Sequence, residues 1–127
     1  MFEQDYIKRQ LRAAVEGIAR TLKLLKEQRY DDAEGDLDAA LDELLTVDRE
    51  VFETLDAASL LPLLGQPARV EAIAQVLTAQ AVVCDAQQLG QRAQRLRRRA
   101  LVFFEHAATN GMECSAAMQQ IREELNS

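Results

Sequence analysis

The fold of this chain is decided by Arg29-Tyr30-Asp31-Asp32-Ala33, a stretch followed by Leu37 and Ala40-Leu41. Sixty residues later the pattern returns as Leu89-Gly90-Gln91-Arg92-Ala93, followed by Leu96 and Ala100-Leu101. Each stretch ends one amphipathic segment and opens a second. Small side chains at the start and middle of a second helix let it pack closely on the first helix. The pattern therefore predicts two helical hairpins, in which Ala33 and Ala93 lie where the helices approach most closely.

The composition favours an all-α protein. A chain of 127 residues has the size of one domain, and its 48% apolar and 28% charged residues are ordinary for a globular protein. Strong helix formers dominate, and only five glycines and two prolines interrupt them. No segment alternates with period two, so we predict no strand. We expect one all-helical domain, a compact bundle of five to seven helices.

Hydrophobic periodicity and helix-capping residues set the expected boundaries. We predict a hairpin over 5–47, short helices over 48–66, a second hairpin over 67–110 and a C-terminal helix over 113–125. The expected N-caps are Asp5 for the first helix, Asp31 or Asp32 for the second, and Asp48 and Asp56 for the short ones. Gly65 should end the short helices, Pro67 should open the next helix, and Asn110-Gly111 should end the second hairpin. Pro62 is expected near the start of its helix, where proline is tolerated.

The apolar residues predict one buried stripe on each long helix. The first helix should bury Ile7, Leu11, Ala14, Val15, Ile18, Leu22 and Leu25, and the second Ala33, Leu37, Ala40, Leu41 and Leu44. The second hairpin should bury Val70, Ile73, Val76, Leu77, Ala81 and Cys84 on its first helix. On its second helix it should bury Ala93, Leu96, Ala100, Phe103, Phe104 and Ala107. In the last helix the stripe is Cys114, Ala117, Met118, Ile121 and Leu125.

The hairpins resemble tetratricopeptide repeats. The matching positions in the first are Gly17, Thr21, Leu24, Tyr30, Ala33, Leu37 and Ala40, and in the second Leu77, Ala81, Cys84, Gly90, Ala93 and Ala100. The chain departs from that family in spacing, because such repeats recur about every 34 residues. It also resembles a functionally uncharacterised bacterial group of small repeat-like proteins that begin with an Asp-Tyr-Ile segment, here Asp5-Tyr6-Ile7. These resemblances imply the hairpin fold and a bacterial cytoplasmic origin, but no chemistry.

Charge is unevenly distributed along the chain. Residues 31–56 hold eleven acidic side chains and one basic one, whereas residues 1–30 hold seven basic and four acidic. The net charge of −6 argues against nonspecific nucleic-acid binding. The acidic run is either a solvated helix face or a docking face for a basic partner. No apolar run approaches the roughly 20 residues of a membrane span, and we expect a cytoplasmic protein with Cys84 and Cys114 as free thiols.

The sequence offers little support for catalysis or metal binding. His106 lies beside Glu105 and could act as a general base, but a histidine near a helix C-terminus is also a common surface residue. Neither cysteine belongs to a nucleophile motif. Two cysteines and one histidine on separate helices fall short of a zinc site. We therefore expect no catalytic residue, no metal and no cofactor.

Five arginines form the sharpest charge feature: Arg92, Arg95, Arg97, Arg98 and Arg99. Arg92, Arg95 and Arg99 are three and four residues apart and share one helix face, which Arg98 borders. Their forked groups suit carboxylates or phosphates. Three interpretations remain open: pairing with the acidic second helix of the same chain or of a second copy, simple solvation, or binding of an acidic peptide or nucleic acid.

We therefore expect a non-catalytic protein–protein interaction module that self-associates, with a homodimer as its simplest form. An alternative is a peptide-binding adaptor, whose groove is lined by the first helix of each hairpin. In it Arg20, Lys23 and Lys26 could hold a peptide carboxylate. A third hypothesis is an enzyme or sensor that uses Cys84, Cys114 or His106.

Overall fold

The computed structural model describes residues 2–109, with side chains for Arg9, Arg12 and residues 16–109, and this part of the chain is folded from helices alone. The elements in chain order are α1 (Phe2–Lys26), α2 (Tyr30–Leu44), α3 (Arg49–Thr54), α4 (Ala57–Leu64), α5 (Pro67–Ala86) and α6 (Gly90–Thr109). The predicted helix over 113–125, the stop at Asn110-Gly111 and Cys114 lie outside the described residues.

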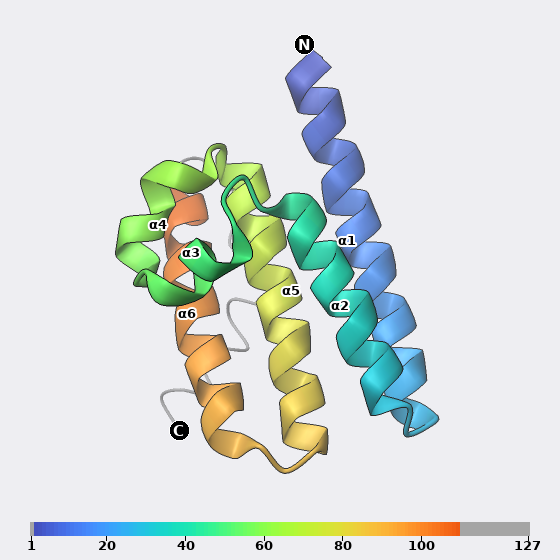
Figure 1. Ribbon diagram of the computed structural model, residues 1–127. Helices are drawn as coiled ribbons and strands as arrows, with labels where there is room; N and C mark the ends of the chain where they lie inside the picture. Colours follow the sequence, from blue (N-terminus) through green and yellow to red (C-terminus); the bar gives the residue numbers. More distant parts are fainter. Residues whose placement is uncertain (1, 110–127) are drawn as a thin grey trace.

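The four long helices of residues 2–109 form two antiparallel pairs (Figure 1). Helices α1 and α2 lie antiparallel, as do α5 and α6, while the short helices α3 and α4 connect the two pairs. Helix α5 also packs on α1, α2 and α4. It is therefore the central rod of the fold, and the N-terminal part of α1 extends beyond its neighbours.

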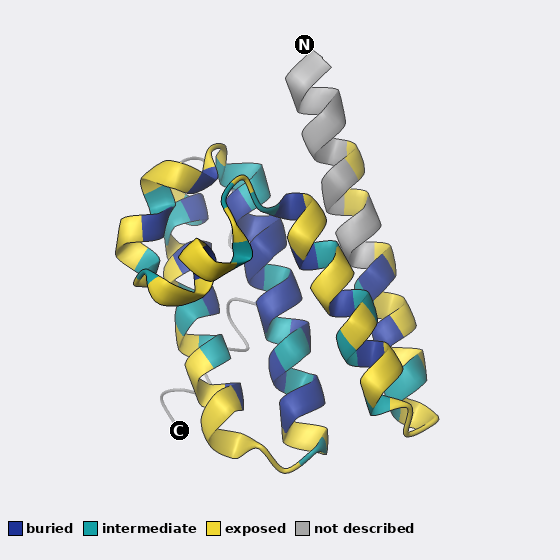
Figure 2. Cartoon of the chain, in the orientation of Figure 1, coloured by how far each residue is buried: buried dark blue, intermediate teal, exposed yellow. Residues whose placement is uncertain are grey.

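Helix α5 is buried on most of its surface (Figure 2). Eleven of its 20 residues are buried, including all six that its apolar stripe predicts. One of the eleven is Glu71, and burial raises the pKa of its carboxyl. The other long helices are amphipathic, because each meets the core with one face.

The two alanines that the repeated pattern marks are buried, as predicted. Ala33 and Ala93 are both 0% exposed. Ala33 joins the main core with Leu37 and Leu41, whereas Ala93 packs in a smaller cluster with Ala81 and Cys84. Two short side chains thus lie inside the helix pairs, where longer ones would hold the helices apart.

The two hairpin turns have the same hydrogen bonding sixty residues apart. In the first, the Gln28 N–H donates to the Leu25 carbonyl and the Arg29 N–H to the Leu24 carbonyl, at 3.0 and 2.9 Å. In the second, the Gln88 N–H donates to Asp85 and the Leu89 N–H to Cys84, at 3.0 and 2.8 Å. Gln28 and Gln88 both adopt positive φ, at 59° and 64°. Each turn is therefore a Schellman motif with glutamine at the left-handed position.

Two of the four predicted N-caps are wrong. Asp5 lies inside α1, which begins at Phe2, and α2 begins at Tyr30 with Arg29 as its cap residue. The tight turn at Gln28 starts α2 before Asp31 and Asp32, so both carboxylates lie in the first turn of the helix. Asp48 and Asp56 are the cap residues of α3 and α4 as predicted.

The buried stripe of α1 differs from the prediction. Leu22 is 49% exposed, whereas its neighbour Thr21 is fully buried, its hydroxyl donating to the Gly17 carbonyl at 2.9 Å. Helix α1 packs on both α2 and α5, and the small Gly17 and Thr21 face that contact in place of Leu22.

The boundaries of α4 and α5 confirm the predictions for Gly65 and Pro67 but not the one for Pro62. Pro62 is the sixth of eight residues in α4 rather than near its start. Gly65 at φ 87° ends α4, and Pro67 occupies the first turn of α5, both as predicted.

Candidate functional site

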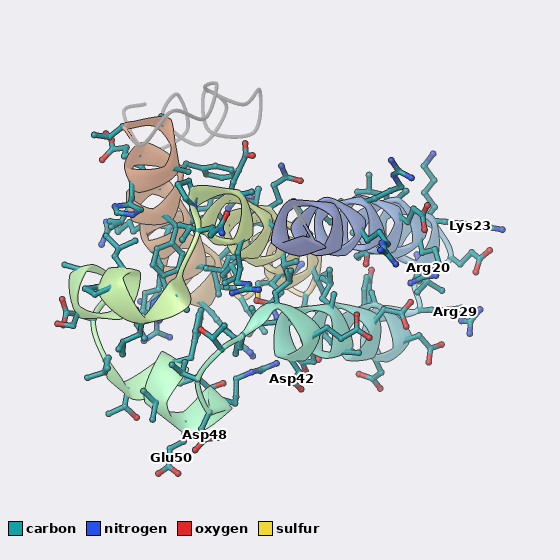
Figure 3. All side chains as sticks on the ribbon, turned by 90° about the horizontal axis from the view of Figure 1, so that it is seen from above. Arg20, Lys23, Arg29, Asp42, Asp48 and Glu50 are labelled. Carbon is teal, nitrogen blue, oxygen red and sulfur yellow. The ribbon has the colours of Figure 1, made fainter. Side chains whose placement is uncertain are left out.

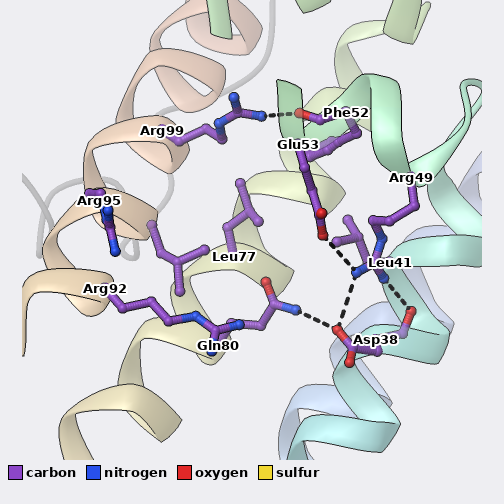
Figure 4. Close-up of a pocket in the computed structure, with 11 residues that line it drawn as sticks. Asp38, Leu41, Arg49, Phe52, Glu53, Leu77, Gln80, Arg92, Arg95 and Arg99 are labelled. Atoms are coloured by element: carbon purple, nitrogen blue, oxygen red, sulfur yellow. Dashed lines mark hydrogen bonds and ion pairs between the residues drawn. The ribbon is translucent and has the colours of Figure 1, made fainter. Parts of the chain in front are cut away.

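A cavity of about 480 Å³ opens between α2, α3, α5 and α6 (Figure 4). Its lining residues are Asp38, Leu41, Arg49, Phe52, Glu53, Leu77, Gln80, Arg92, Arg95, Leu96 and Arg99. Leucines and a phenylalanine form the floor, and charged side chains form the walls. This volume falls within the range of about 300–1,000 Å³ that is typical of ligand sites.

Helix α6 supplies one wall, made of Arg92, Arg95 and Arg99. Their spacing places them on one face, and Figure 4 shows all three reaching from α6 along the cavity. Arg92 and Arg95 are exposed. Neither has a carboxylate within ion-pairing distance among residues 16–109. This wall therefore presents two positive charges that the described part of the chain leaves unpaired.

Arg99 has a structural partner. Its guanidinium donates to the Phe52 carbonyl at 2.6 Å and to the Leu55 carbonyl, and it lies 5.0 Å from the centre of the Phe52 ring. These contacts attach the C-terminal end of α3 to α6. Burial lowers the pKa of Arg99, yet the group stays protonated at neutral pH because an arginine pKa is so high.

Arg49 organises the opposite wall. Its guanidinium lies 3.0 Å from Asp42, 3.4 Å from Asp38 and 3.5 Å from Glu53, and it also donates to the Asp38 carbonyl at 3.0 Å. The Gln80 amide donates to the Asp38 carboxylate at 3.3 Å. The acids of α2 and α3 that face the cavity are thus held by an arginine of α3.

This arrangement corrects one interpretation of the arginine cluster. Pairing with α2 of the same chain does not occur in residues 16–109, because Arg49 engages Asp38 and Asp42 instead. Arg97 pairs with Asp85 of α5 at 2.6 Å, and its side chain is only 12% exposed. Pairing with α2 of a second copy, solvation, and binding of an acidic peptide or nucleic acid remain as interpretations for Arg92 and Arg95.

The charge of the lining differs in sign from that of the chain. Four lining side chains are arginines and two are carboxylates, which gives the cavity a net charge of +2. The whole chain carries −6. A local positive charge in an acidic protein attracts anions to this cavity rather than to the rest of the surface.

A narrower cavity of about 40 Å³ adjoins the first and shares Asp38, Gln80 and Arg92 with it. Cys84 lies on its wall, buried and free of any disulfide. Burial raises the pKa of the Cys84 thiol. The thiol is therefore protonated at neutral pH, the form in which cysteine is a poor nucleophile.

Four residues of the predicted binding set lie outside the cavity. Arg98 is exposed on α6 but does not line the cavity, and Arg20, Lys23 and Lys26 are exposed on α1. None of the α1 residues whose side chains are described lines the cavity, whereas α5, the first helix of the other hairpin, contributes Leu77 and Gln80. Figure 3 shows Arg20 and Lys23 along α1, at a distance from the labelled acids Asp48 and Glu50 near α3.

Sequence reasoning missed Arg49, Phe52 and Gln80. The sequence could have indicated the role of Arg49, because it is the one basic residue in the segment 31–56, which holds eleven acidic ones. No feature of the sequence indicated the roles of Phe52 and Gln80, since these depend on how α3 lies relative to α5 and α6. His106 lines neither cavity.

Within the described residues, no group of three or more His, Cys, Asp or Glu side chains is arranged to hold a metal ion. No helix described here has the length and apolar character needed to cross a membrane. No family model, curated protein or solved structure matches this chain.

Proposed function

We propose that the protein is a non-catalytic protein–protein interaction module that binds an acidic segment of its partner in the cavity between α2–α3 and α6. The observation that carries this proposal is the net +2 lining, with Arg92 and Arg95 unpaired. Guanidinium groups bind carboxylates in two-pronged hydrogen bonds and cannot lose their charge near neutral pH. The described lining residues offer guanidinium, carboxylate, amide and apolar groups, which suit the binding of an anionic segment.

The two hairpins are proposed to form a tetratricopeptide-like pair. The equivalent Schellman turns and the buried Ala33 and Ala93 support this proposal. The cavity differs from the groove expected of a peptide-binding adaptor. Its walls come mainly from α2, α3 and α6 rather than from the first helix of each hairpin.

The test is fluorescence anisotropy with a labelled degenerate peptide pool in which Asp and Glu fill half of the positions. The matched controls are a Lys/Arg pool and the variant Arg98→Gln, which loses the same charge outside the cavity. We expect the wild type and Arg98→Gln to bind the acidic pool, and the double variant Arg92→Gln/Arg95→Gln to bind at least about tenfold more weakly. Equal binding by the double variant, or no binding by the wild type, would contradict the proposal.

Self-association is a second candidate, favoured by the exposed acids of the same chain. Asp31, Asp32, Asp42, Asp48 and Glu50 are all exposed, so a second copy could present an acidic segment to the cavity. Light scattering would then give a mass above one chain at micromolar concentration, falling in Arg92→Gln/Arg95→Gln. A mass of one chain throughout that range would exclude self-association. A cytoplasmic location stays a prediction.

A further inference from the structure

We propose that the group bound by Arg92 and Arg95 is a phosphoryl dianion, carried by a phosphorylated serine or threonine of the partner segment. This inference rests on the proposed function and names the chemistry of the ligand. It follows from three features of the cavity: the spacing of the two arginines, the charge of the lining and the state of Arg99.

The spacing places the two arginines on one face of α6, along the same cavity (Figure 4). Arg92 and Arg95 lie three residues apart on one helical face, where side chains start about 5–6 Å from each other. Both line the same cavity, and both lack an acidic partner in the described part of the chain. A carboxylate has two oxygens, enough for one fork. A phosphoryl group has three terminal oxygens and can serve both forks at once.

The positive charge of the lining also favours a phosphoryl group over a carboxylate. Arg92 and Arg95 carry an excess of +2, because no carboxylate of residues 16–109 pairs with either of them, whereas Arg49 is balanced by Asp38, Asp42 and Glu53. A single carboxylate leaves half of that excess in place, whereas a phosphorylated side chain carries about −1.5 to −2 at neutral pH. One such group therefore neutralises the cavity without needing a second acidic residue at a fixed distance.

Arg99 is already bound to backbone carbonyls of the chain, so Arg92 and Arg95 are the residues available to bind the anion. Two of the five N–H donors of Arg99 bind the Phe52 and Leu55 carbonyls and hold the guanidinium against the Phe52 ring, so its charge contributes to the cavity from a fixed position. Arg92 and Arg95 are thus the residues expected to touch the phosphoryl oxygens, and Arg99 adds attraction over a longer distance.

The experiment compares three degenerate peptide pools that differ only in their central residue, which is phosphoserine, aspartate or serine. Anisotropy is measured with the full chain at neutral pH and fixed salt. We expect the phosphoserine pool to bind at least about tenfold more tightly than the aspartate pool. Arg92→Gln and Arg95→Gln should each remove this preference, and Arg98→Gln should keep it.

Two further measurements make the assignment specific. The double variant Arg92→Lys/Arg95→Lys keeps the charge but loses the forks, so it should keep only the part of the preference that comes from charge, and its affinity ratio between the two anionic pools should fall below that of the wild type. Below the second phosphate pKa of about 6, the preference of the wild type should shrink, because the phosphoryl group takes up a proton. Circular dichroism establishes that each variant is folded.

The outcomes separate this inference from the proposed function. Equal binding of the aspartate and phosphoserine pools would overturn the phosphoryl assignment and leave the acidic-segment proposal standing. Binding of inorganic phosphate as tight as that of the phosphoserine pool would overturn the assignment to a protein segment. Absence of binding by any pool would overturn both.

Discussion

Ala33 and Ala93 show at the residue scale how short side chains set the distance between helices. Both are completely buried, and each lies four residues after the residue that accepts its backbone hydrogen bond, Arg29 or Leu89. The first turn of each second helix thus begins against its partner, and the core has no space for a larger group at either position.

Replacing these alanines with leucine should destabilise the protein. Ala33→Leu and Ala93→Leu add three carbons to a packed contact, and we expect each to lower the free energy of unfolding by about 1–3 kcal/mol. Ala39→Leu on the exposed face of α2 is the matched control and should change stability little. Urea denaturation measures all three, and an unchanged midpoint for both buried substitutions would contradict the packing.

Sequence reasoning succeeded where the signal was local. Ala33 and Ala93 were identifiable because the repeat marks them, and Gly65 and Pro67 because helix ends have characteristic residues. Leu22 was assigned to the core wrongly, since hydrophobicity cannot show that α1 must meet two helices through Gly17 and Thr21.

At the scale of single elements, the two hairpin turns are the most informative. Both use glutamine at a position that glycine occupies in most Schellman motifs. A side chain at this left-handed conformation costs roughly 1 kcal/mol through the contact of its Cβ with the backbone. Each turn therefore holds a small strain that the surrounding helix packing outweighs.

Glycine should relieve that strain. Gln28→Gly and Gln88→Gly are expected to raise the free energy of unfolding by about 0.5–1 kcal/mol each. The control Gln94→Gly places the same change at an exposed position in the second turn of α6, where it should cost about 0.5–1 kcal/mol. Thermal unfolding decides the matter: a loss of stability in both turn variants would show that the glutamines contribute more than their backbone strain.

Helix α3 depends on side-chain contacts for its position. It has six residues and buries Phe52, while Arg49 connects it to α2 and Arg99 connects it to α6. A helix this short has little stability of its own. Its place over the cavity was not predictable from the sequence, because neither arginine reveals its partner until the chain is folded.

Loss of the Arg99 contacts should loosen α3. Arg99→Met keeps most of the apolar stem but removes the donors to Phe52 and Leu55, and we expect a loss of about 1–3 kcal/mol in stability. Amide hydrogen exchange in α3 should rise more than exchange in α5. Arg98→Met, a neighbouring exposed substitution, should affect neither, and equal protection of α3 in both variants would contradict this role.

The whole molecule is organised around α5, which packs on α1, α2, α4 and α6. The sequence predicted two hairpins, but their packing against each other was not predictable from it. Helix α5 carries apolar residues on several faces, so no single stripe indicates which helices it contacts. The cavity forms where the two hairpins pack against each other. Its walls come from α2, α3 and α6, three elements whose charged residues were identifiable while their common location was not.

Protection against hydrogen exchange should follow this organisation. Amides in the middle of α5 should exchange only through global unfolding, with the free energy that denaturant measures, whereas those of α3 and α4 should open locally at lower cost. Native-state exchange with increasing urea tests this order. Local opening of α5 ahead of α3 would contradict the central place of α5.

The position of α5 between the hairpins also affects how the protein is made. A ribosome completes α1 and α2 before it synthesises residues 67–86, the helix that covers part of their apolar surface. At about 5–20 residues per second, the nascent chain waits on the order of one to several seconds with Leu37, Leu41 and Leu44 incompletely covered. We therefore expect the segment before residue 67 to expose apolar surface during translation, and a chain truncated there to be unstable.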